Sequence, residues 1–253
     1  MQNNSDFLQL VADLRAIGIQ EGDSLLVHSS FNSMGHIEGG IATLIAAFRH
    51  VLGETGTLIV PTLSYASVTV DQPVFDYQNT PSCVGAVSEY VRNLPEAIRS
   101  VHPTHSCAAI GMRAKEFTCD HQLDNTPVGP HSPFYKLRMA HGKILMLGCG
   151  TACNTSMHGV EELFGTFYVL TPEPIPYKIV MPDSTYDAPQ YRHNFGPHHL
   201  AQRYARLTSV LSPEAMKQGL IHGAESTLYD AAQVWDTGLA TLQKDELYFV
   251  EKV

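Results

Sequence analysis

The sequence lacks several features that would settle its class directly. No stretch approaches the roughly 20 consecutive apolar residues of a membrane span. The opening residues MQNNSDFLQL hold no basic segment followed by an apolar one, so no secretory signal is expected. The five cysteines form no CxxC pair, which argues against a disulfide framework and against a structural zinc site. We therefore expect a cytoplasmic protein without a membrane partner.

Basic charge is scarce as well. Lys and Arg number 16 against 25 Asp and Glu, which gives a formal net charge of −9. Nucleic-acid binding needs clustered Lys and Arg and is not expected, whereas the acidity permits a cationic substrate. The hydrophobic fraction of 44% is enough for a sizeable core. Because no internal repeat or Gly/Ser linker divides the chain, we expect one domain over residues 1–253.

Helical and strand patterns alternate along the chain. Gly39-Gly40 stands before the second helical segment, and the order strand, helix, strand predicts a parallel pair with a right-handed crossover. The alternation indicates an α/β fold. Expected helices cover 6–17, 41–52, 84–92, 157–164, 198–210 and 227–237, expected strands cover 24–28, 56–60, 107–110, 143–148 and 247–250, and residues 171–191 are expected to line a cleft as irregular structure or short strands.

Polar residues follow the first expected strand. Ser29 and Ser30 come directly before Phe31, and Gly39-Gly40 opens the next helix. Hydroxyls and backbone amides at such a junction can hold a phosphate without Lys or Arg, and ligands of α/β sheets bind at the carboxyl ends of strands. An ordinary polar turn fits the same residues. Neither GxGxxG nor GxxxxGKS is present, so a Rossmann or P-loop site is not supported.

Histidines gather in two further segments. Residues 99–106 combine His102 and His105 with two serines, as either a site or an exposed connection. In the second segment, His158 and Glu161 stand three apart on the helix expected after the strand at 143–148. A carboxylate beside an imidazole fixes its tautomer and favours proton uptake, which a general base requires. The same spacing also occurs as a plain surface pair.

Other catalytic arrangements find less support. The histidines could ligate zinc or iron, but neither HExxH nor HxHxD is present. A serine hydrolase would need a GxSxG elbow, which is absent. Cys149 and Cys153 fit small buried residues better than a nucleophile paired with histidine. The candidate metal ligands are His102, His105, His158, Glu161, His193, His198 and His199.

Five separated motifs occur in a fixed order. They read VHSSF, GGIATLIAAFRHVLGETGTLIVPTLSY, FDYQNTPSCVGAVSEYVRNLPEAIRSVHPTHSCAAIG, NTPVGPHSPFYKL and NTSMHGVEELFG. Together they resemble the aminoglycoside 3-N-acetyltransferase family, strongly over residues 5–165 and loosely beyond. The resemblance implies a single-domain α/β/α sandwich with a mostly parallel central sheet, distinct from the GNAT fold. It also implies an enzyme that uses acetyl-coenzyme A and an amine acceptor.

The resemblance further implies roles for individual residues. Motif by motif, the catalytic histidine falls on His158, its supporting carboxylate on Glu161, and the histidine of VHSS on His28 beside them. No metal is implied. The implied coenzyme contacts are Ser29, Ser30, Phe31, Gly39, Gly40, Thr62, Ser64, His102 and Ser106, and the implied acceptor contacts are Tyr65, Asp76 and Glu162.

The expected function is direct transfer of an acetyl group from acetyl-CoA to the 3-amino group of an aminoglycoside, with His158 taking the proton. Residues 191–207 are basic, including Arg192, Arg203 and Arg206, where acid would favour a polycation. This leaves another small amine open as the acceptor. From other classes, a metal-dependent hydrolase built on the histidines and a non-catalytic coenzyme A-binding protein remain alternatives. The expected partners are the amine and coenzyme A, and a homodimer stays open.

Overall fold

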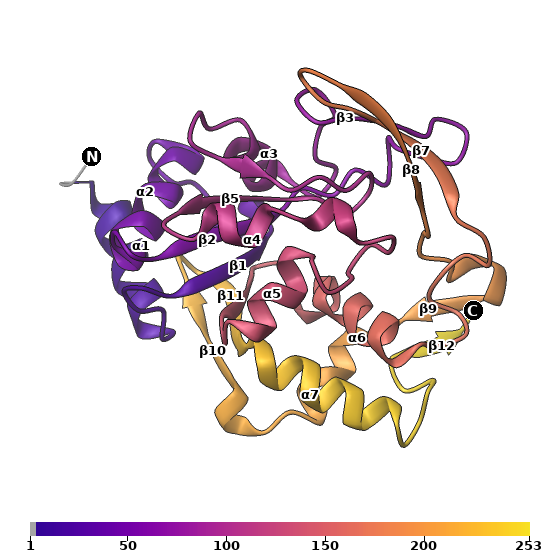
Figure 1. The fold of residues 1–253 in the computed structure, drawn as a ribbon. Coiled ribbons are helices and arrows are strands. Elements are labelled where there is room, and N and C mark those ends of the chain that lie inside the picture. The colour runs from indigo at the N-terminus through magenta and orange to yellow at the C-terminus, as the bar shows by residue number, and fades with distance from the viewer. Residues whose placement is uncertain (1–3) are drawn as a thin grey trace.

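A seven-stranded sheet lies between two layers of helices in the computed structural model, which describes residues 4–253 (Figure 1). Across the sheet the strands follow the order β10-β11-β6-β1-β2-β5-β4. Their bounds are Met216–Ile221, Ala224–Asp230, Lys143–Leu147, Ser24–Ser29, Thr57–Pro61, Cys107–Gly111 and Ile98–Arg99.

Most strands of the sheet run in one direction. β1 pairs in parallel with both β2 and β6, while β11 is antiparallel to β6 and β5 is antiparallel to β2. The outer strands β10 and β4 are antiparallel to β11 and β5 and so return to the direction of the centre. Five of the seven strands therefore point the same way, and the expected mostly parallel sheet is confirmed.

The two helical layers follow from alternation along the strands. Leu25 and Val27 of β1 face one layer and Leu26 faces the other, because successive side chains of a strand point to opposite faces. The first layer holds α1 (Ser5–Ala16), α2 (Gly40–Leu52) and α3 (Ala86–Arg92). The second holds α4 (Ala114–Thr118), α5 (Pro133–Met139), α6 (Ser156–Phe164) and α7 (Ala231–Leu242). This arrangement confirms the α/β/α sandwich.

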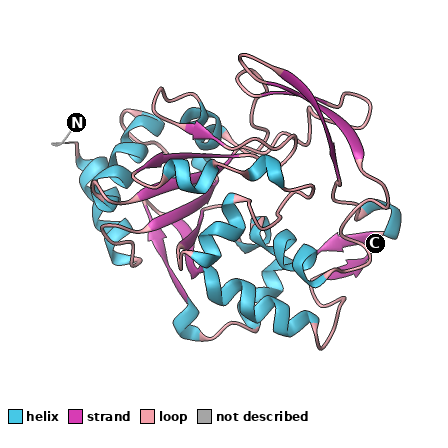
Figure 2. Ribbon diagram, in the orientation of Figure 1, coloured by secondary structure: helices cyan, strands magenta, loops and turns pink. Residues whose placement is uncertain are grey.

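Two smaller sheets stand beside the sandwich. β7 (Ile175–Val180) and β8 (Thr185–Gln190) form a hairpin that pairs with β3 (Val74–Asp76), and the hairpin extends away from the helical layers (Figures 1 and 2). β9 (Leu200–Gln202) pairs with β12 (Val250–Lys252). The expected short strands within 171–191 are confirmed.

Among residues 4–253, no helix has the length and apolarity that crossing a membrane requires.

The C-terminal third differs most from the expected elements. The helix expected over 198–210 is wrong, because β9 pairs with β12 and only a 3-10 helix, Tyr204–Ser209, follows. The helix expected from residue 227 begins at Ala231, where the Asp230 carboxylate caps the backbone N–H of Gln233. The preceding residues are strand β11. The last strand begins at Val250 rather than at residue 247.

Candidate active site

A cavity of about 580 Å³ opens at the edge of the central sheet where β1 and β2 end. His28 and Ser29 reach it from β1, Thr104 and His105 from the loop before the antiparallel β5, and His158 from α6. The carboxyl edge of an α/β sheet is where ligands of such folds bind. The other lining residues are Pro61, Leu63, Tyr65, Cys83, Val84, Ser88, Cys149, Ala152, Cys153, Asn154, Thr155, Arg192, His193, Gln202 and Tyr204.

The start of α6 brings His158 to the cavity. The Asn154 side chain accepts from the backbone N–H of Ser156 at 3.1 Å, and so satisfies one donor of the first turn. Gly159 follows His158 and lies against Trp235, whose ring would stand 2.1 Å from a Cβ at that position. The missing side chain therefore lets α6 pack tightly on α7, while the neighbouring His158 lines the cavity.

A tyrosine hydroxyl connects the predicted pair His158 and Glu161. The shortest direct contact, Nδ1 to Oε2, is 3.7 Å and too long for a hydrogen bond. The Tyr204 hydroxyl lies 2.6 Å from Glu161 Oε2 and 2.8 Å from His158 Nδ1. Tyr168 donates to the other carboxylate oxygen at 3.1 Å. The sequence did not single out Tyr204, because no motif marks the segment 198–210, which was expected to be a helix.

This geometry assigns the protons. A carboxylate that receives two hydroxyl donors acts as an acceptor, so Tyr204 donates to Glu161 and accepts from His158 Nδ1. Burial and the neighbouring Glu161 raise the pKa of Tyr204 well above its usual value, which keeps the proton on the phenol. The Nε2 atom of His158 is left with a free lone pair beside the cavity.

Three imidazole rings meet at this wall, and we call His105, His158 and His193 the histidine cluster. His158 stacks on His193 with ring centroids 4.1 Å apart, and His105 stands edge-on to both. One ring nitrogen of each residue lies within 4.8 Å of one ring nitrogen of each of the others. From the sequence, all three were expected as candidate metal ligands, and His158 was also expected to be the catalytic base.

Glu162 supports the histidine cluster from behind and does not line the cavity. Its Oε1 lies 2.7 Å from His193 Nε2, and both carboxylate oxygens accept from the Val128 N–H. Burial raises the pKa of Glu162 to about 8 and lowers that of His193 well below its usual value. The pair therefore carries no net charge at neutral pH. Glu162, which was expected at the acceptor, contacts His193 and Val128 in the structure.

The two other predicted histidines differ from each other. His28 lines the cavity, its Nε2 has no hydrogen-bond partner among residues 4–253, and burial lowers its pKa to about 3. His102 is buried behind the cavity wall, where its Nδ1 accepts from the backbone N–H groups of Thr104 and His105. His102 thus shapes the turn, and His105 is the histidine of that segment that reaches the cavity.

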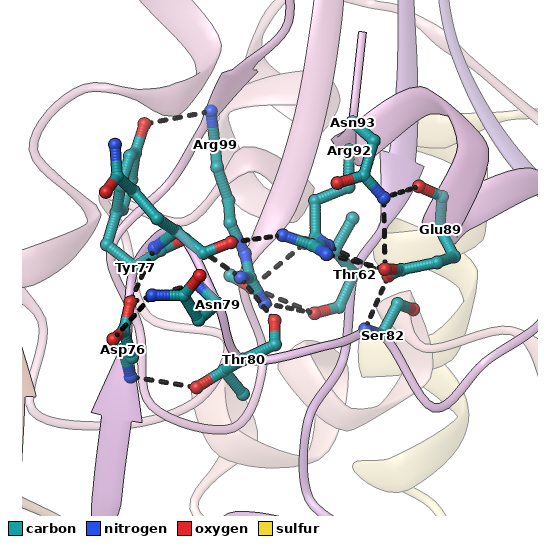
Figure 3. Close-up of polar contacts among 12 residues, drawn as sticks. Thr62, Asp76, Tyr77, Asn79, Thr80, Ser82, Glu89, Arg92, Asn93 and Arg99 are labelled. Carbon is teal, nitrogen blue, oxygen red and sulfur yellow. Dashed lines mark hydrogen bonds and ion pairs between the residues drawn. The ribbon is translucent and has the colours of Figure 1, made fainter.

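Most of the predicted coenzyme contacts of the PTLSY and HPxxS motifs form a buried wall. Thr62 and Ser106 share a hydrogen bond of 2.9 Å, and the Ser64 hydroxyl donates to the Pro103 carbonyl. Ser106 also accepts from Nε of Arg99, whose buried guanidinium further donates to three backbone carbonyls (Figure 3). None of Thr62, Ser64 and Ser106 lines the cavity.

Asp76 and Tyr65 separate in the structure, although both were expected at the acceptor. Tyr65 lines the cavity and is 43% exposed. The Asp76 carboxylate instead closes its own turn, accepting from the backbone N–H groups of Gln78 and Asn79 and from the Asn79 side chain (Figure 3). These contacts lower the pKa of Asp76. The structure does not bring Asp76 into the cavity.

The predicted residues between β1 and the start of α2 occupy different environments. Ser29 lines the cavity, whereas Phe31 packs against the first core layer. Ser30 occupies the cap position of a 3-10 helix (Phe31–Met34), and Gly39, with a φ of 77°, precedes the first turn of α2. A positive φ is available to glycine without strain, so this glycine lets the chain turn directly into the helix.

Several cavity residues were not predicted as site residues. Cys149 is half-buried and Cys153 is exposed, so the expectation that both are buried is wrong. Arg192 follows the β7-β8 hairpin and donates to the carbonyls of Tyr65 and Val68. Basic composition hinted at Arg192, but no motif tied it to the cavity.

Comparison with known proteins identifies the family. A family model described as aminoglycoside 3-N-acetyltransferase matches residues 26–243. The chain belongs to the aminoglycoside 3-N-acetyltransferase family. Aminoglycoside N(3)-acetyltransferase IV from Salmonella sp is 31% identical, with 96% of this chain and 89% of the relative aligned. Aminoglycoside N(3)-acetyltransferase VII from Streptomyces paromomycinus is 29% identical, with 93% and 91% aligned.

Solved structures of aminoglycoside acetyltransferases share the fold. AAC-IIIb in a binary complex with CoASH is 29% identical, with a TM-score of 0.79 over 94% of this chain and 96% of that one. A histidine-to-alanine variant of AAC(3)-IVa bound to a gentamicin is 29% identical, with a TM-score of 0.83 over 98% and 92%. These findings confirm the family, the fold and the enzyme class, an acetyl-CoA-dependent N-acetyltransferase.

Proposed function

We propose that the protein transfers an acetyl group directly from acetyl-CoA to an amine, with His158 as the general base. The 3-amino group of an aminoglycoside is the acceptor that the family predicts. The observation that carries the proposal is the free Nε2 of His158 at the cavity, with Nδ1 held by the Tyr204 hydroxyl, which in turn donates to Glu161. General-base assistance of this kind is worth roughly 10²–10⁴ in rate.

In the proposed step the amine nitrogen attacks the thioester carbonyl. A carbon–nitrogen bond forms, the carbon–sulfur bond breaks, and the departing sulfur takes up a proton as coenzyme A. The attacking nitrogen gives its proton to His158 Nε2, and the positive charge on the ring is stabilised through Tyr204 by Glu161. Most of the remaining acceleration comes from holding amine and thioester together. Thr62 is committed to Ser106, so Ser29 is the predicted hydroxyl that remains free to stabilise the oxyanion.

The coenzyme is proposed to lie between the start of α2 and the cavity. The first backbone N–H groups of a helix attract anions, and α2 is 13 residues long with Gly39 exposed before it. The phosphates would lie at this turn and the pantetheine would enter past Ser29. In this proposal the path by which the coenzyme enters the cavity is shaped by Ser30, Phe31 and Gly40, which do not contact its thioester.

A small amine other than an aminoglycoside is the second candidate acceptor. No Asp or Glu occurs among the described residues that line the cavity, and Arg192 is the lining residue with a permanent charge. Arg192 donates to backbone carbonyls and to the Tyr177 hydroxyl, so these contacts do not neutralise it. Several ammonium groups would meet a positive potential here. This favours an amine with one positive charge or with an acidic group.

The test uses purified protein, acetyl-CoA and a panel of acceptors, with release of the coenzyme thiol as the signal. We expect turnover with at least one amine, and a 10²–10⁴-fold lower kcat for His158→Ala with coenzyme binding retained. Near-normal turnover of that variant would show that His158 is not the base. Tight binding of acetyl-CoA without thiol release for any amine would instead favour a non-catalytic binding protein.

The panel also separates the two acceptor candidates. Aminoglycosides, monoamines and amines with a carboxylate or phosphonate are compared by kcat/KM, and Arg192→Gln is measured beside the wild type. If the acceptor is a polycation, Arg192→Gln raises kcat/KM. If the acceptor is acidic, the same variant lowers it.

We further propose that the chain acts in the cytoplasm as one acetyltransferase domain and forms a homodimer, which light scattering would measure.

A further inference from the structure

The histidine cluster has the donor set of a transition-metal site. Its three imidazoles come from separate parts of the chain: His105 precedes β5, His158 lies on α6 and His193 follows the β7-β8 hairpin. Zinc is bound by histidine nitrogens at about 2.0–2.1 Å, so ligand atoms in a tetrahedral complex lie about 3.4 Å apart. The ligand atoms lie within 4.8 Å of one another, so a tetrahedral complex requires them to approach by at most about 1.4 Å.

Each ring already has its second nitrogen fixed by a polar partner. His105 Nδ1 lies 2.9 Å from the Thr104 hydroxyl, His158 Nδ1 is held by Tyr204, and His193 Nε2 is held by Glu162. Such outer partners orient the rings of histidine ligands in metal sites and raise their basicity. The nitrogens left without a partner among residues 4–253 are Nε2 of His105, Nε2 of His158 and Nδ1 of His193.

Charged groups of both signs surround the histidine cluster. Arg192 lies close enough to disfavour added positive charge on His105 and His193. The Glu161 carboxylate opposes it from one contact further back, through Tyr204. Glu162, which contacts His193 directly, adds a second negative charge only when it loses its proton. Three protein ligands leave a fourth position open toward the cavity, which a water molecule can fill.

We infer that the histidine cluster binds a divalent transition-metal ion of the Zn²⁺ type, and that this ion blocks acetyl transfer. Binding rests on the geometry alone, and the block rests on the proposed function. The lone pair of His158 Nε2 cannot coordinate a metal and accept the amine's proton at the same time. The site is therefore inhibitory, and the family's chemistry needs no metal at it.

The experiment titrates metal-free protein with Zn²⁺ in competition with a chromophoric chelator, and with Co²⁺ to read the ligand field. We expect one equivalent of metal, a four-coordinate Co²⁺ spectrum, and at least tenfold weaker binding in His193→Ala and in His105→Gln. His50→Ala is the matched control, because His50 is exposed on α2. Circular dichroism checks that each variant is folded.

The same samples measure the block. We expect Zn²⁺ to abolish thiol release at one equivalent and EDTA to restore it. Unchanged metal affinity in both folded histidine-cluster variants would overturn the site, as would binding that His50→Ala weakens equally. Full turnover of the zinc-loaded protein would overturn the block. Stoichiometric zinc binding by a protein that acetylates no amine would leave the site standing and count against the proposed function instead.

Discussion

Arg99 and the histidine cluster, two groups of polar side chains near the cavity, differ in how far their hydrogen-bonding capacity is used. Arg99 is 5% exposed and its guanidinium donates to the hydroxyl of Ser106 and to the carbonyls of Tyr77, Thr80 and Thr62 (Figure 3). Its charge also stacks on the Phe75 ring at 4.7 Å. The histidine cluster instead leaves one nitrogen of each ring without a partner among residues 4–253.

This difference distinguishes a residue that stabilises the fold, Arg99, from residues that can bind a ligand, the histidine cluster. Burial lowers the pKa of Arg99 to about 10, which still leaves it charged at neutral pH, and its hydrogen bonds offset the cost of burying that charge. A group whose hydrogen-bonding capacity is filled has nothing left for a ligand. The free nitrogens of the histidine cluster retain that capacity, and they face the cavity.

The largest expected effects come from two variants, one of which should lose stability and the other turnover. Arg99→Leu leaves several buried acceptors without a donor, so we expect a loss of about 3 kcal/mol in the free energy of unfolding. We expect its kcat to stay within tenfold of the wild type. His158→Ala should keep its stability and lose turnover. Urea unfolding and thiol release measure both, and a stable Arg99→Leu protein would contradict the structural role.

The next effect is the pH dependence of the free energy of unfolding, to which the buried His121 contributes. Ser100 donates to its Nδ1 and its Nε2 lies 3.3 Å from the Pro127 carbonyl, and burial lowers its pKa to about 3. The unfolded chain protonates this ring near pH 6.5. The unfolded state therefore binds more protons below pH 6.5, and stability falls as the pH falls from there toward 3.

Replacing the ring should flatten this dependence. Between pH 6 and 4, His121→Gln removes up to about 1.4 kcal/mol per pH unit from the slope of unfolding free energy. His50→Gln on the exposed side of α2 serves as the control and should leave the slope unchanged. Equal slopes for wild type and His121→Gln would show that this ring does not titrate on unfolding. Urea midpoints at each pH give the measurement.

A smaller effect is expected for the connection through Tyr204. Tyr204→Phe removes the hydroxyl between Glu161 and His158 but keeps the ring, so kcat should fall about tenfold, the equivalent of 1.4 kcal/mol. The KM for acetyl-CoA should not change, and the acidic limb of the kcat profile should shift. A stability loss with an unchanged pH profile would reduce Tyr204 to a packing role.

The smallest effect is expected at Asp76. Asp76→Asn weakens the contacts to Gln78 and Asn79 and should cost about 1 kcal/mol of stability, as for a lost cap. The KM for the amine should stay the same, because Asp76 does not line the cavity. A KM that rises severalfold would return Asp76 to the acceptor site.

The sequence predicted the parts of the fold that depend on local pattern. The helices at 6–17 and 41–52 have periodic apolar residues followed by glycine, and the strands at 24–28 and 143–148 are short apolar runs. Each agrees with the structure within about two residues. The segment at 198–210 failed because its backbone pairs with β12, about fifty residues later, and no local pattern records such a partner.

The candidate site divides in the same way. His28, His158 and Glu161 stand in motifs of the family, so the resemblance implied that they lie together. Tyr204 and His193 reach the cavity only through tertiary packing of the last third, and no motif marked them as catalytic. Thr62, Ser64 and Ser106 show the reverse error, since polar residues in a shared motif became a buried wall.

The position of Tyr204 in the chain has a consequence for synthesis. His158 and Glu161 emerge from the ribosome before the hydroxyl that connects them, and α7, which packs against α6, comes later still. A nascent chain that ends before residue 204 has its base without the partner that orients it. Full activity should therefore appear late in translation, when the last third folds onto the sheet edge.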